Sequence, residues 1–91
     1  MDIRIWPKDS GDGLPLLLVN ASRKQGRAVV RNRFRRRVRM AFLKVLRDNP
    51  GLARAGTVVW VRPARGTRRC DTPFLVIEGQ LKLALSPRDP R

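Results

Sequence analysis

Basic side chains are concentrated in one stretch of this 91-residue chain. From residue 23 to residue 39, nine of seventeen residues are Lys or Arg, and no Asp or Glu occurs between Asp12 and Asp48. Arginine outnumbers lysine by seventeen to four over the whole chain. Its planar guanidinium can donate two parallel hydrogen bonds to a phosphate or stack on a base. This stretch therefore offers anion-binding chemistry, and its arginine bias favours nucleic acid as the partner.

The remaining side chains offer little for hydrolysis. Cleavage of a phosphodiester usually needs metal-binding carboxylates or a His and Lys pair acting as base and acid. The chain has no His, and its seven acids are scattered along the sequence. The single cysteine, Cys70, has no His to serve as its base, so we expect a surface or loop thiol. An independent enzyme is not predicted.

The basic stretch also has the periodicity of an amphipathic helix, which we place at residues 27–48 before the stop signals Asn-Pro-Gly. Apolar residues recur at the spacing of one helix face. They are Val30, Phe34, Val38, Ala41, Phe42 and Val45. The opposite side carries Asn32, Arg33, Arg35, Arg36 and Arg39, with Arg31 and Arg37 on its borders. Like charges at this spacing cost about 0.2–0.5 kcal/mol per pair on an isolated helix, so we expect one face to pack and the other to meet an anion.

Three strands are predicted around this helix. Alternation before Pro7 predicts a strand over residues 2–7, and an apolar run predicts another over residues 14–21. The turn-rich residues 8–13 would join these two strands as a β-hairpin. β-Branched and aromatic residues predict a third, buried strand over residues 57–62.

A second basic loop, residues 64–69, precedes the last predicted element, a helix over residues 72–85. Asp71 and Thr72 offer capping side chains, and Pro73 suits the first helical position. A helical stripe follows, made of Phe74, Ile77, Leu81 and Leu85. Gly79 interrupts that stripe and residues 81–85 alternate, so a strand stays open as the alternative.

The element order predicts an α+β fold, a small two-layer sandwich of a mixed sheet and two helices. Its length is that of one domain, residues 1–91, with a loose polar tail at about residues 86–91.

The net charge of +14 implies attraction to polyanions. No apolar run approaches the ~20 residues of a spanning helix, and early acids argue against a secretion signal. A basic helix adsorbed to anionic lipid is the rival from another class, but its apolar face is needed for packing.

The run SRKQGRAVVRNRFRRRVR resembles the signature of the protein subunit of bacterial ribonuclease P. The matching residues are Ser22, Arg23, Lys24, Gly26, Ala28, Val29, Arg31, Asn32, Arg33, Arg35, Arg36 and Arg39. Element order extends the resemblance less strictly over about residues 14–85. Two departures stand out. The sequence starts without the aromatic helix that precedes the first strand in that family, and Met40 stands where a Glu is common.

The resemblance implies a cytoplasmic protein of bacteria whose partners are ribonuclease P RNA and precursor tRNA, with no membrane and no small-molecule substrate. In that family the RNA subunit and substrate hold the catalytic Mg²⁺, and the RNA cuts the 5′ leader from precursor tRNA. The protein subunit braces the RNA and holds the leader. A left-handed strand–helix–strand crossover is also implied, against the usual right-handed preference. Another RNA-binding protein, such as a ribosomal protein, is the alternative.

The resemblance also carries residue roles, and none of them is catalytic or metal-binding. Residues expected to bind RNA are Arg23, Lys24, Arg27, Arg31, Asn32, Arg33, Arg35, Arg36 and Arg39. A solvated basic face is their alternative. Candidates for the leader are Trp6, Ser22 and Trp60. Trp6 lies at a strand end, where stacking is favoured, whereas the valines around Trp60 favour the core, with an RNA-binding cleft as the alternative.

Overall fold

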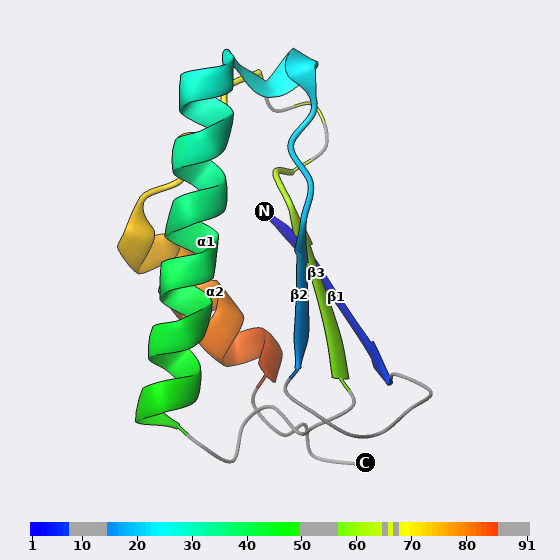
Figure 1. Ribbon diagram of the computed structural model, residues 1–91, viewed down its shortest axis with the longest axis vertical. Helices are drawn as coiled ribbons and strands as arrows, with labels where there is room; N and C mark the ends of the chain where they lie inside the picture. Colours follow the sequence, from blue (N-terminus) through cyan, green and yellow to red (C-terminus); the bar gives the residue numbers. More distant parts are fainter. Residues whose placement is uncertain (8–14, 50–56, 65, 67, 86–91) are drawn as a thin grey trace.

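The computed structural model describes residues 1–7, 15–49, 57–64, 66 and 68–85. The elements are β1 (Asp2–Pro7), β2 (Leu16–Val19), the 3-10 turn η1 (Arg23–Gln25), α1 (Ala28–Asp48), β3 (Thr57–Arg62) and α2 (Phe74–Leu85). Both helices lie on the same side of the sheet (Figure 1). The α+β sandwich with a mixed sheet is therefore confirmed. The predicted turn at residues 8–13 and tail at residues 86–91 lie outside the described residues.

The sheet has the order β1-β3-β2, so β3 lies in the centre. It pairs with β1 in antiparallel and with β2 in parallel orientation. The predicted hairpin of the first two strands is therefore wrong: β3, whose valines are buried on both faces, takes the place between them. A parallel pair needs a crossover connection, and α1 supplies it between β2 and β3. The left hand of this crossover stays a prediction.

The core lies between the sheet and the two helices. All six apolar residues of the predicted stripe on α1 are buried, with Phe34 and Val38 fully enclosed. Val59 and Val61 of β3 face them, and Ile77, Leu81 and Leu85 of α2 close the cluster. The predicted helix over residues 72–85 is confirmed over its alternative, a strand, and α2 begins at Phe74, directly after Pro73.

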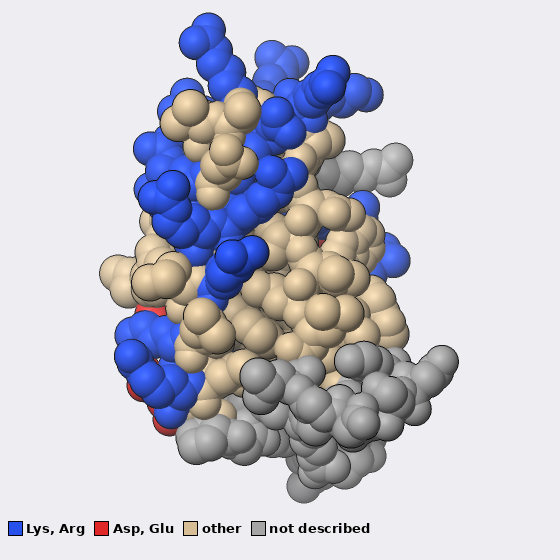
Figure 2. Space-filling model, in the orientation of Figure 1, with Lys and Arg blue, Asp and Glu red and all other residues tan. Residues whose placement is uncertain are grey.

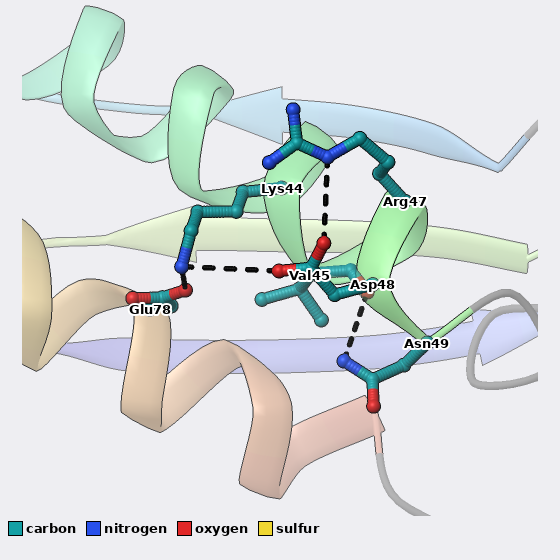
Figure 3. Close-up of polar contacts among 6 residues, drawn as sticks. All are labelled: Lys44, Val45, Arg47, Asp48, Asn49 and Glu78. Carbon is teal, nitrogen blue, oxygen red and sulfur yellow. Dashed lines mark hydrogen bonds and ion pairs between the residues drawn. The ribbon is translucent and has the colours of Figure 1, made fainter.

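Polar contacts hold the two helices together along one flank of α1 (Figure 3). Lys44 forms an ion pair with Glu78 of α2 and lies 3.8 Å from Asp48 of its own helix. Nearer the start of α2, Arg37 Nη1 donates to the carbonyl oxygen of Thr72 over 3.1 Å. This flank of α1 therefore stabilises the fold and is distinct from the outward basic face.

Cys70 is in a loop, as predicted, but it is not a surface thiol. Only 1% of the residue is exposed. Burial raises the pKa of the thiol, because the interior disfavours the thiolate. Its backbone N–H donates to the carbonyl oxygen of Gln25 over 2.8 Å, which ties the segment after β3 to η1.

Candidate nucleic-acid interface

The outward face of α1 carries the exposed residues Asn32, Arg36 and Arg39. They line a shallow concavity of about 360 Å³ together with Arg35 and Met40. Figure 2 shows Lys and Arg side chains gathered over the N-terminal half of α1, whereas acidic side chains lie beside its other half. This face can therefore meet a polyanion, and no carboxylate of the described residues lines the concavity to compete for its cations.

Arg35 is half-buried, although the helical wheel placed it on the outer side. Its Nη2 donates to the carbonyl oxygen of Ala21 and its Nη1 donates to Asn32 Oδ1, both over 3.3 Å. The bond to Asn32 uses the amide oxygen, which leaves the amide NH₂ group to donate outward. Arg35 therefore orients Asn32 and fixes the chain before η1 while it lines the interface.

Arg31 and Arg33 are also half-buried, and the Nε atom of each is enclosed without a hydrogen-bond partner among the described residues. For Arg31 this agrees with its predicted place at the border of the apolar stripe, whereas Arg33 was predicted on the opposite, outer side. Arg31 and Arg33 can join the interface only at its borders.

Three more predicted cations precede the helix. Arg23, Lys24 and Arg27 are exposed around the start of α1, where no acidic residue occupies the first turn and Arg27 makes no capping bond with its side chain. The helix dipole adds positive potential at this end. These side chains are therefore brought together with the positive end of α1, which favours an anionic partner there.

Gly26 makes this arrangement possible. Its φ of +129° lies in a region that L side chains rarely adopt, and a Cβ atom would stand 3.0 Å from Cγ1 of Val30. Only glycine lets the chain turn from η1 into α1 while it packs against that valine. The motif glycine therefore positions Lys24 next to the helix start.

The second surface is the face of the sheet away from the helices. Because side chains alternate along a strand, Trp60 lies on this face while Val59 and Val61 enter the core. The prediction that Trp60 belongs to the core is therefore wrong, and its register partners are Arg4 on β1 and Leu18 on β2. The Arg4 and Arg62 guanidinium carbons lie 5.6 and 5.0 Å from the centre of its ring.

Trp6 lies on the same face, 41% exposed, with Val58 as its partner on β3. The two tryptophans are thus brought onto one platform by antiparallel pairing. Leu16 and Leu18 of β2, both exposed, extend it on the other side. This mixture of aromatic and aliphatic side chains with two arginines can stack bases and hold a backbone.

Ser22, the third leader candidate, lies away from Trp6 at a concavity of about 620 Å³. The lining residues are Ser22, Lys24, Gln25, Arg62, Pro63, Gly66 and Arg68. Arg62 connects this concavity to the platform, because its guanidinium also lies over Trp60. Arg62 and Arg68 were not among the predicted site residues. The basic run at residues 64–69 was the available signal for Arg68, but nothing in the sequence placed it next to Ser22.

No three His, Cys, Asp or Glu side chains of the described residues come together as a metal cluster. The described residues therefore offer Mg²⁺ no cluster of carboxylate ligands. Among the helices of the same residues, none has the length and apolarity to cross a membrane.

The chain was also compared with known families, curated proteins and solved structures. The family described as Ribonuclease P matches residues 2–82, which include all three strands, the whole of α1, and α2 as far as Lys82. No curated protein and no solved structure shows a significant match. Since the family match spans most of the chain, the protein belongs to the ribonuclease P family, as a protein subunit of this tRNA-processing complex with an RNA partner.

Proposed function

We propose that the chain binds ribonuclease P RNA through the basic face of α1 and the 5′ leader of precursor tRNA through the platform of Trp6 and Trp60. The observation that carries the proposal is the division of cations into two groups. Arg36 and Arg39 project from the helix beside the neutral Asn32, whereas Arg4 and Arg62 flank an aromatic ring on the opposite side of the sheet.

The two surfaces suit different forms of RNA. A helix face with several guanidinium groups suits the phosphates of a folded RNA, which position a protein without reading sequence. A flat platform with exposed tryptophans suits unpaired bases, since stacking tolerates every base and contributes about 1–3 kcal/mol per base. The leader is the single-stranded part of the precursor, so we assign it to the platform.

In this proposal the protein subunit carries no catalytic residue. The described residues supply no cluster for Mg²⁺, and the chain has no His, so we assign the metal ions and cleavage to the RNA subunit and substrate. The chain's own part is to neutralise phosphates that would otherwise repel one another and to hold the leader. We place this activity in the bacterial cytoplasm, where precursor tRNA is processed.

Reconstitution of the full chain with a bacterial ribonuclease P RNA at low Mg²⁺ tests the proposal. We expect the chain to stimulate cleavage of precursor tRNA and its affinity for the RNA to fall with salt, by about 0.7–0.9 in log–log slope for each neutralised phosphate. Arg36→Ala and Arg39→Ala should each reduce that slope, whereas Arg47→Ala, at the far end of α1 beside Asp48, should not. Binding to ribosomal RNA without any stimulation of cleavage would instead favour a ribosomal protein.

A further inference from the structure

The segment that follows β3 carries cations that the proposed surfaces do not use. Arg68 and Arg69 are both exposed and lie beside the start of α1, where they line a concavity of about 510 Å³ with Gly26, Arg27 and Val29. Arg68 also lines the 620 Å³ concavity on its other side, with Lys24 and Arg62. Arg68 therefore stands between the helix surface and the sheet surface.

The segment is held at both ends. Pro63 and Cys70 are buried, and the N–H of Cys70 donates to the carbonyl oxygen of Gln25 over 2.8 Å. Between them Gly66 has a φ of +86°, which favours glycine and turns the chain back toward η1. Arg68 is thus presented by a segment that is anchored to the rest of the fold on either side.

The three cations around the larger concavity differ in what already engages them. Arg62 Nε lies 3.4 Å from Asp2 Oδ2, at ion-pair distance but without the geometry of a hydrogen bond, and its guanidinium lies over Trp60. Among the described residues, Lys24 and Arg68 form no ion pair and no carboxylate lines the concavity. Arg69, by contrast, is paired with Asp71 at 3.4 Å. The uncompensated charge is therefore concentrated on Lys24 and Arg68.

We propose that Lys24, Arg62 and Arg68 form a third, loop-borne RNA site that holds one segment of sugar–phosphate backbone. The inference rests on the proposed function and adds a third contact region to it. The volume suits a nucleotide-sized ligand, and three converging cations without a carboxylate suit a phosphodiester. Since Arg62 also touches the platform, the segment bound here continues toward Trp60. The backbone can come from the ribonuclease P RNA or from the leader, and the experiment separates these two sources.

The test uses three variants of the full chain, namely Arg68→Ala, Lys24→Ala and the double variant. Arg47→Ala is the control, because it removes an exposed arginine far from the proposed site. In the first arm, affinity for ribonuclease P RNA is measured against salt without substrate. In the second arm, the affinity of the assembled holoenzyme for precursor tRNA with a long leader or a leader of one nucleotide is measured, also against salt. We expect Arg68→Ala to lower the salt slope by about 0.7–0.9 in one arm. That arm identifies whether the bound backbone belongs to the ribonuclease P RNA or to the leader. Arg47→Ala should match the wild type in both arms.

The double variant tests whether the site is shared. Because both side chains hold the same backbone segment, the fold losses in affinity of Lys24→Ala and Arg68→Ala should not multiply in the double variant. Fully multiplicative losses would place the two residues on separate segments and overturn the shared site.

The failure of this inference is distinguishable from the failure of the proposed function. If Arg36→Ala weakens assembly but Arg68→Ala equals the wild type in both arms, the loop-borne site is refuted and the proposed function stands. If the wild-type chain does not stimulate cleavage at all, the proposed function fails and the loop-borne site fails with it.

Discussion

Arg35 Nη2 lies 3.3 Å from the carbonyl oxygen of Ala21, so the basic helix is hydrogen-bonded to the chain that leaves β2. Ala21 is itself buried, which leaves its carbonyl oxygen with few other donors. A side chain of the interface therefore also stabilises the fold, and this connects RNA binding with the geometry of the strand-to-helix connection.

Arg35→Ala and Arg36→Ala should separate these two roles. Loss of the bond to Ala21 should lower the free energy of unfolding by about 0.5–1.5 kcal/mol, whereas Arg36, which is exposed, should leave it unchanged. Both variants should bind ribonuclease P RNA more weakly. Denaturant melts and RNA titrations of the two proteins check this, and equal melts would mean that the bond to Ala21 contributes nothing to stability.

Gly26→Ala should destabilise the protein by about 1–3 kcal/mol, because alanine strains the backbone at this positive φ and its Cβ would crowd Val30. Gly79→Ala is the matched control. It lies exposed within α2 with no atom within 4 Å of the added Cβ, so the better helix propensity of alanine should raise stability by about 0.4–1 kcal/mol. Thermal melts should therefore shift in opposite directions, and a shared sign would refute the backbone argument.

Trp60→Ala should reduce the affinity of the holoenzyme for a precursor with a long leader by about 1–3 kcal/mol. The loss should nearly vanish with a leader of one nucleotide, since no base then reaches the platform. Trp60→Phe should restore part of the affinity by keeping a stacking face. Leu83→Ala, which removes an exposed apolar side chain from α2, is the control. An equal loss with both leaders would remove Trp60 from the leader path.

The stability contribution of Cys70 should fall in alkaline solution. Its pKa is raised in the folded protein, chiefly by burial, so above the ordinary thiol value of about 8.5 the unfolded chain releases a proton that the folded chain retains. The folded state then binds more protons, and the free energy of unfolding declines as pH rises. Denaturant melts at about pH 7.5 and about pH 9.5 should show a steeper decline for the wild type than for Cys70→Ala. Identical declines would contradict the prediction.

Local sequence determined the elements that depend on periodicity. The stripe from Val30 to Val45 established both the extent of α1 and its buried face, because residues on one helix face share a single environment. The β-branched run at residues 57–62 likewise identified β3 to the residue. The motif around Asn32 indicated the family through residue types and spacing alone, and the family match over residues 2–82 confirms it.

The tertiary structure decided what depends on contacts between distant residues. Strand order was one such feature, since adjacency in sequence predicted a hairpin of β1 and β2 while β3 pairs with both. The face of Trp60 was another, because strand alternation is fixed only when Val59 and Val61 are known to enter the core. The placement of Arg68 at the same concavity as Lys24 was a third such feature. Its position depends on the bond between Cys70 and Gln25, and no local pattern of residues encodes a hydrogen bond between backbone groups so far apart in the chain.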